Sequence, residues 1–171
     1  MNGFGRGILG LPPVVKNIIF INVIMLLADY AAKSVFGIDL TMILGLYFPK
    51  SEQFMPVQIV THIFMHGGFW DIFFNIYALY ILGQVLENVW GPKRFFIFYI
   101  ICGLGAAFTH ETVIALQYSH LLQSLSPENL QLVLNEGTAL FKQGQGFIDP
   151  DMLKLQTLLN TPTVGASGAV F

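Results

Sequence analysis

The amino-acid sequence predicts an all-α protein, a polytopic membrane helix bundle with three spans and the start of a fourth. Two features of the composition predict this class: 54% of the 171 residues are hydrophobic, and the mean hydropathy is +0.65. Only 11% of the residues are charged, against roughly 25% in average soluble domains, and so few charges cannot cover the surface of a soluble protein. The third feature is a set of three long apolar segments.

The three apolar segments are expected to span the membrane near residues 14–36, 66–90 and 95–116. None is an uninterrupted run of 18 or more uncharged residues, the usual sign of a lone spanning helix. Such interruptions are typical of a bundle, where polar side chains face protein or water, although core helices of a soluble protein would show them too. In the first segment, Asp29 and Lys33 are four residues apart and can pair on one helix face.

Basic residues predict the orientation of the chain. Arg6 and Lys16 precede the first segment, and Lys93 and Arg94 lie in the short turn between the second and third. Both places are on one side of the membrane, which the positive-inside rule identifies as cytoplasmic. We expect an integral protein of the bacterial cytoplasmic membrane, surrounded by the lipid bilayer, with residues 1–13 as a cytoplasmic N-terminal segment.

A fourth apolar segment begins at residue 164 and stops at Phe171. A helix over these residues would cover only about 12 Å at 1.5 Å per residue, whereas the hydrocarbon core is about 30 Å thick. The sequence therefore suggests a chain that is interrupted early in a fourth span. The region 117–162 before this segment is expected to be an extracytoplasmic helical insertion.

Two helices are predicted within the insertion from their end signals. In the first, Ser126 is the N-cap, Pro127 is the first helical residue and Gly144 is the stop. In the second, Asp149 is the N-cap and Pro150 is the first helical residue. Apolar residues recur on one face, so the helices form either a surface cap packed on its own core or an amphipathic cap at the membrane interface.

A single hydroxyl stands among small residues near the C-terminus, in the sequence Gly165–Ala166–Ser167–Gly168. In a membrane helix such a serine usually serves packing, because small residues let helices approach closely. The same glycines would let a partner helix place a base beside Ser167, which makes this serine a candidate nucleophile. The motif alone does not decide between these two roles.

Four polar residues mark the outer end of the second segment. Asp71 and Asn75 are four apart and share a helix face, and polar groups at such a place suggest function. His62 and His66 fit interfacial polarity equally well, and histidines four apart can also ligate zinc. The metalloprotease motif needs a glutamate directly after the first histidine, however, and Ile63 stands there.

Other features have simpler interpretations. Glu87 precedes the turn at residues 91–94, where a helix end with compensating charges is expected. In the third segment, Gly103 and Ala107 form a small-residue face that is expected to pack against another helix. Cys102 is the sole cysteine, so no disulfide can form within the chain. The net charge of −2 gives no indication of a nucleic-acid partner.

Together these features resemble the rhomboid family of intramembrane serine proteases. The resemblance covers residues 56–171 and rests on H-x3-H-x4-D-x3-N at 62–75, E-x3-G at 87–91, the small-residue third segment and the final GASGAVF. It implies that residues 14–171 are a partial rhomboid domain with a six-helix core. The implied activity is a serine endopeptidase that hydrolyses peptide bonds of membrane-anchored proteins with a Ser–His dyad. The implied substrates are transmembrane proteins, and neither a cofactor nor a metal is expected.

By this resemblance Ser167 is the nucleophile, and its backbone N–H and the Asn75 side chain stabilise the oxyanion. A serine becomes a good nucleophile only when an adjacent imidazole takes its proton, and in this family the imidazole belongs to a histidine on the sixth helix. The resemblance gives structural roles to His62, His66, Glu87, Gly165 and Gly168.

Three features depart from the family pattern. Asp71 stands where members usually carry a second oxyanion-side histidine; an ionised carboxylate would repel the oxyanion, so activity is expected to be weakened or favoured at lower pH. No histidine follows Ser167, so the chain lacks the base and should be inactive as given. Residues 109–162 are long for a connection between spans, which suggests a cap that gates or selects substrate.

Two other functions compete with the protease. A non-catalytic rhomboid-like protein that binds transmembrane partners is favoured by Asp71, and by the missing base only if the natural chain is this short. A metal carrier would use His62, His66, Asp71 and His110.

Overall fold

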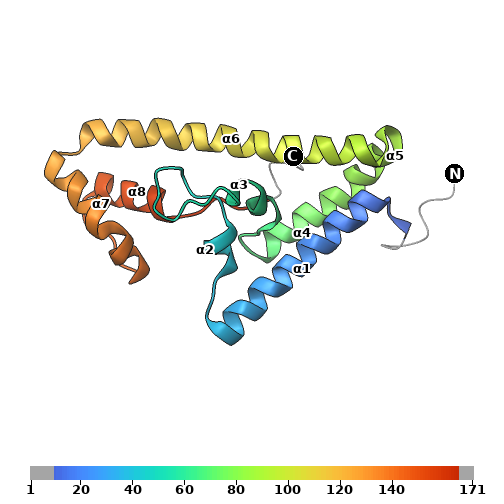
Figure 1. The fold of residues 1–171 in the computed structure, drawn as a ribbon, viewed down its shortest axis with the longest axis horizontal. Coiled ribbons are helices and arrows are strands. Elements are labelled where there is room, and N and C mark those ends of the chain that lie inside the picture. The colour runs from blue at the N-terminus through green and yellow to red at the C-terminus, as the bar shows by residue number, and fades with distance from the viewer. Residues whose placement is uncertain (1–9, 166–171) are drawn as a thin grey trace.

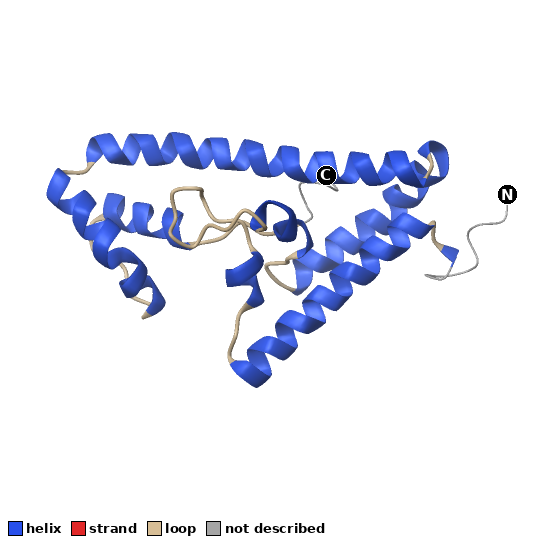
Figure 2. Ribbon diagram, in the orientation of Figure 1, coloured by secondary structure: helices blue, strands red, loops and turns tan. Residues whose placement is uncertain are grey.

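The structure is a computed structural model that describes residues 10–165, and these are predominantly helical (Figure 2). The predicted all-α class is confirmed. The elements in order are α1 (Pro13–Phe36), α2 (Leu40–Leu44), α3 (Gln58–Thr61), the 3₁₀ turn η2 (His62–Phe64), α4 (Phe69–Ala78), the π-helical turn η3 (Leu79–Gly83), α5 (Gln84–Trp90), α6 (Pro92–Ser124), α7 (Pro127–Lys142) and α8 (Pro150–Asn160).

Three helical stretches in the described part of the chain are long and apolar enough to cross a membrane. They are α1, the continuous run from α4 through η3 to α5, and α6. In Figure 1, α6 follows one edge of the molecule, α1 and α4 slope away from one of its ends, and α7 and α8 lie beneath its other end. This arrangement confirms the predicted polytopic helical bundle, and the predicted Asp29–Lys33 ion pair forms at 2.8 Å.

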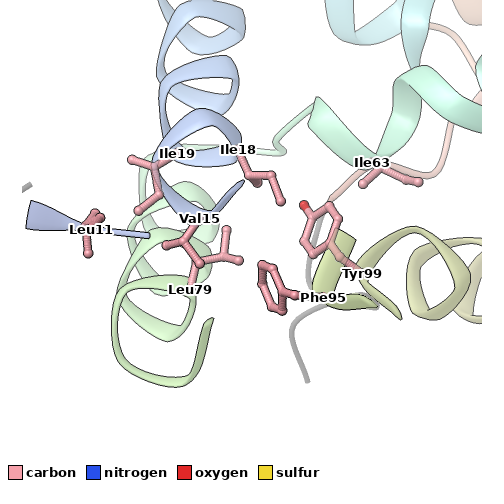
Figure 3. Close-up of a cluster of buried hydrophobic side chains, with 8 residues drawn as sticks. All are labelled: Leu11, Val15, Ile18, Ile19, Ile63, Leu79, Phe95 and Tyr99. Carbon is pink, nitrogen blue, oxygen red and sulfur yellow. The ribbon is translucent and has the colours of Figure 1, made fainter. Parts of the chain in front are cut away.

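A buried apolar cluster joins the three spanning helices (Figure 3). Its members are Leu11, Val15, Ile18, Ile19, Ile63, Leu79, Phe95 and Tyr99. Gly83 in η3 lets α1 approach the second span closely, because a Cβ at this position would lie 2.9 Å from Val15 Cγ2. Any side chain there would push the two helices apart.

The start of α1 is held by a carboxylate from the second span. Pro12 offers no side-chain cap, but the buried Glu87 side chain accepts hydrogen bonds from the backbone N–H groups of Val14 at 2.9 Å and Val15 at 2.8 Å. The first N–H groups of a helix lack partners in their own helix, and an anion is favourable there. The predicted compensation of Glu87 by the basic turn is wrong, since no ion pair joins them in the described residues.

The helix α6 is longer than the third apolar segment. It continues past Leu116, the predicted end of the span, to Ser124. At 1.5 Å per residue its 33 residues extend about 50 Å, against about 30 Å of hydrocarbon. The helix continues because Tyr118 and Leu121 pack in a second apolar cluster with residues of α7 and α8. The predicted start of the insertion at residue 117 therefore lies inside α6 rather than at a helix end.

The predicted ends of α7 and α8 are confirmed. Ser126 Oγ accepts a hydrogen bond from the backbone N–H of Asn129 at 3.3 Å. A carboxylate oxygen of Asp149 accepts the N–H groups of the second and third residues of α8 at 3.0 Å each. Gly144, just after α7, has a φ of 72°, a left-handed conformation that suits glycine and ends the helix.

The two helices of the insertion pack on their own core. The second cluster consists of Phe48, Leu121, Val133, Met152, Leu155 and Leu159, so it joins α7 and α8 to α6 and to the loop between α1 and α4. The insertion is thus attached to the bundle and to the loop between α1 and α4. Its place relative to the membrane interface stays a prediction.

One buried glutamine organises the loop between α1 and α4. The Gln58 Nε2 group donates to the carbonyl oxygens of Ile43 and Gln53, both at 3.0 Å. Its Oε1 atom accepts from the backbone N–H groups of Met55 at 3.0 Å and Tyr47 at 3.4 Å. Because both ends of the amide are satisfied, Gln58 fixes the course of a loop that has little regular structure.

Replacing Glu87 tests how α1 is docked. Glu87→Ala leaves the Val14 and Val15 N–H groups without an acceptor, so we expect the free energy of unfolding to fall by about 1–3 kcal/mol. Asn88→Ala, at the exposed neighbouring residue, is the control and should change it by less than about 0.5 kcal/mol. Denaturant unfolding in detergent measures both variants. Equal effects would contradict the docking role.

Candidate functional site

Ser167 and Gly168 lie outside the described residues. The part of the candidate site that the structure describes is therefore the segment that leads to Ser167 and the residues around it. The extended segment 161–165 runs beside the loop, where Leu46 and Thr163 exchange two backbone hydrogen bonds of 2.8 and 2.7 Å. The N–H of Gly165 then donates to the carbonyl oxygen of His62 at 3.1 Å. The backbone is therefore fixed up to two positions before the candidate nucleophile.

The sequence predicted that a fourth span begins at residue 164, but no helix begins there. Val164 and Gly165 are not helical, and Gly165 has a φ of 119°. The reason is that their backbone continues the extended segment and is held by the bond to His62 rather than by a helical turn. The residues after Gly165 lie outside the described part of the chain.

Two glycines bring this segment close to the loop and to the start of α4. A Cβ at Gly45 would lie 2.8 Å from Pro162 Cβ and 2.9 Å from Val164 Cγ1, so a larger residue would separate the loop from the segment. On the other side, a Cβ at Gly67 would lie 3.7 Å from Val164 Cγ2. Val164 is therefore held between the loop and the residues that lead into α4.

Asp71 and Asn75 share one face at the start of α4, as predicted. One Asp71 oxygen accepts the backbone N–H of Gly67 at 3.0 Å, and the other accepts Asn75 Nδ2 at 2.9 Å. Asp71 lies in the first turn of α4, where a negative charge is favourable. Asn75 is 1% exposed, and its Oδ1 atom has no partner among the described residues. One amide hydrogen of Asn75 is engaged by Asp71, and no partner is seen for the second among the described residues.

His62 and His66 do not share a helix face. The 3₁₀ turn η2 ends at Phe64, and Met65 is extended with φ −93° and ψ 151°, so the chain turns between the two histidines. The second span also begins later than the predicted residue 66, at Phe69, because the residues before it belong to this turn. The described residues contain no group of three or more His, Cys, Asp or Glu placed to hold a metal ion.

Both histidines are buried and neutral. His62 Nδ1 lies 2.9 Å from the carbonyl oxygen of Gln58, and because a carbonyl only accepts, Nδ1 is the donor. Burial lowers the pKa of His62 below its usual value. Burial also lowers the pKa of His66, against the opposing effect of the nearby Asp71 charge. The ring nitrogens of His66 have no hydrogen-bond partner among the described residues.

A cavity of about 210 Å³ adjoins the segment that leads to Ser167. It is lined by His62, Gly103, Ala106, Ala107, His110, Thr163, Val164 and Gly165. The small residues of α6, predicted to pack against another helix, therefore line this space. A larger groove of about 740 Å³ between α6 and α8 shares His110, Thr163 and Val164 with it.

The sequence did not indicate which residues hold the segment in place. Gln53 Nε2 donates to Asn160 Oδ1 at 2.9 Å, and this contact joins the loop to the end of α8. No local pattern distinguishes such amides from ordinary surface residues. The glycine at position 45 was the nearest available signal, because a glycine between apolar residues often marks a close backbone approach.

The buried histidines are expected to make the fold less stable in acid. Their folded-state pKa values lie below 6.5, so the unfolded chain takes up protons first as the pH falls through 6.5. Stability is complete above this pH and is lost below it, by up to about 1.4 kcal/mol per histidine per pH unit, until the folded pKa is reached. Thermal unfolding in detergent across this range measures the effect.

The matched variants are His66→Gln and, at an exposed position, His120→Gln. His66→Gln should reduce the pH dependence of the unfolding midpoint, and His120→Gln should leave it unchanged. The same pH dependence in wild type and His66→Gln would show that His66 does not contribute.

The chain matches the family model described as the Rhomboid domain over residues 53–171. No curated protein and no solved structure matches it. The matched region contains the loop from residue 53 onward, the Asp71–Asn75 pair, α6, the insertion and the segment that leads to Ser167. It covers more than half of the chain, so this membrane protein belongs to the rhomboid family, whose members are generally intramembrane proteases.

Proposed function

We propose that this chain carries the nucleophile and part of the oxyanion site of an intramembrane serine endopeptidase. Its substrates are transmembrane proteins within the lipid bilayer. One observation carries the proposal: the segment that leads to Ser167 is fixed at Thr163 and Gly165 against the residues that precede α4. Asn75 lies in the second turn of α4, and from this we infer that Ser167 and Asn75 belong to one region of the fold.

The chemistry assigned to this region is acyl transfer to a serine. Ser167 Oγ attacks the scissile carbonyl carbon, and the charge that develops on the carbonyl oxygen is stabilised by the Ser167 backbone N–H and the free amide hydrogen of Asn75. The serine proton must pass to a base. No histidine follows Ser167 in these 171 residues, so we assign the base to a histidine beyond them and expect the 171 residues alone to be inactive.

The orientation assigned to the protein follows from its charges. The basic residues Lys93 and Arg94 lie at the turn that ends the second span, and Asp71 and Asn75 lie at its opposite end. If the basic turn faces the cytoplasm, the site faces the outer side and the N-terminus is cytoplasmic. Water can then reach the site from the outer surface of a bacterial cytoplasmic membrane.

Asp71 has two opposing effects in this proposal. It holds Asn75 in place by accepting one amide hydrogen, and it places a carboxylate beside the developing oxyanion. A like charge within a few ångströms raises the free energy of the transition state. We therefore propose that Asp71 slows the reaction while it orders the oxyanion site.

A second function is favoured by the same residue. A non-catalytic rhomboid-like protein that binds transmembrane partners does not need an oxyanion site. A carboxylate beside Asn75 would therefore not impair its function. The two proposals differ in the reactivity of Ser167.

Serine labelling separates the two functions. We expect a fluorophosphonate probe to label the full-length protein in membranes, because the probe forms a covalent bond only with an activated serine. Ser167→Ala should abolish the label, and Ser124→Ala, at an exposed serine of α6, is the control that should keep it. Absence of labelling in wild type would favour the binding protein.

Substitution of Asp71 tests its effect on rate. Asp71→His removes the negative charge and supplies a donor, so cleavage of a transmembrane substrate at neutral pH should be faster by about tenfold or more. Asp71→Asn is the matched control, since it removes the charge and keeps an oxygen for the Asn75 amide. If neither variant is faster than wild type, the charge of Asp71 does not limit the reaction.

A further inference from the structure

A chain of amide side chains, buried except for the half-buried Gln53, links α8 to the loop beneath the site. Asn160, the last residue of α8, is 2% exposed. Its Oδ1 atom accepts Gln53 Nε2 at 2.9 Å, and its Nδ2 group donates to the carbonyl oxygen of Gln156 at 2.8 Å. Both ends of the Asn160 amide are therefore used, one toward the loop and one toward its own helix.

The same chain continues toward His62 on the loop side. The carbonyl oxygen of Gln53 accepts Gln58 Nε2 at 3.0 Å, and the carbonyl oxygen of Gln58 accepts His62 Nδ1 at 2.9 Å. The backbone carbonyl oxygen of His62 in turn accepts a hydrogen bond from the N–H of Gly165. The loop that Asn160 contacts is thus the loop that holds the residue two positions before Ser167.

On the other side, the amide chain reaches α7. The Gln156 side chain is fully buried, and its Nε2 group donates to the carbonyl oxygens of Gly137 at 2.9 Å and Gln145 at 3.1 Å. The two helices of the insertion are therefore fixed to each other before α8 meets the loop.

Asn160 stands directly before the extended segment that leads to Ser167. That segment has no helix or sheet of its own. The N–H of Thr161 still donates to Thr157 in α8, and the backbone bonds beyond Thr161 go to the loop, at Leu46 and His62. A buried backbone needs such partners, so its position depends on how α8 and the loop are held together. A fully satisfied buried amide network is rigid, and a half-satisfied one is costly.

We propose that the α7–α8 pair is a brace that positions the nucleophile, with Asn160 as its central positioning residue. The proposal rests on the assignment of Ser167 as nucleophile. It differs from the substrate gate expected from the sequence, because a brace affects the reaction of Ser167 with every reagent. A gate would alter only the choice or entry of substrates.

The test uses the full-length protein and a small fluorophosphonate, which needs no substrate gate. Asn160→Ala should lower the maximal labelling rate about ten- to a hundredfold, because a displacement of about 1 Å is enough for such a loss. The probe concentration that gives half of this rate should change little. Asn135→Ala, at an exposed asparagine of α7, is the matched control and should label like wild type.

A second readout is independent of catalysis. In hydrogen exchange, Asn160→Ala should speed exchange of the Thr163 and Gly165 amides at least tenfold, while the amides of the α1 core stay protected. If Asn160→Ala does not fold, Asn160→Asp takes its place. It keeps the acceptor for Gln53 but loses the donor to Gln156 when ionised, so its labelling should fall at neutral pH.

The outcomes separate this proposal from the proposed function. If wild type is not labelled, the protease assignment fails, and hydrogen exchange still decides whether Asn160 holds the segment. If wild type is labelled through Ser167 and folded Asn160→Ala labels and exchanges like wild type, the brace is overturned and the protease assignment stands.

Discussion

The pairing of Leu46 with Thr163 is the interaction on which the rest of the site depends. It brings the chain that follows the insertion against the loop that precedes α4, and these two parts are far apart in the sequence. The bond from Gly165 to His62 and the close approach at Gly45 then define where the segment points. Without this pairing, the extended segment after α8 would keep only the bond from Gly165 to the residues that precede α4.

The membrane helices supply a fixed frame for this pairing. Glu87 and Gly83 hold α1 against the second span, and the apolar cluster ties both to α6. The long α6 carries the insertion beyond the length needed to cross a bilayer and returns it, through α8, to the same loop. Hydrophobic packing sets the positions of the helices, and buried amides set the register of the polar segments between them.

The helical class, the three spans and the helix ends in the insertion could be predicted from the sequence, because apolar composition and capping residues such as Ser126 and Asp149 act locally. The pairing of Gln53 with Asn160, the partner of Glu87 and the extended path at Val164 could not. Each depends on a contact between distant residues that leaves no periodic pattern. The turn at Met65, which separates His62 from His66, is likewise not indicated by the spacing of the two histidines.

The central claim is that the fold brings Ser167 to Asn75 at the outer end of the second span. The most direct measurement is cross-linking in a Cys102→Ser background of the full-length protein, with cysteines at positions 75 and 167. A short thiol-reactive cross-linker should join this pair within one molecule, as scored by mass spectrometry. A pair at 88 and 167, about 20 Å further along the span, should not be joined. Equal yields for the two pairs, or none at 75 and 167, would contradict the claim.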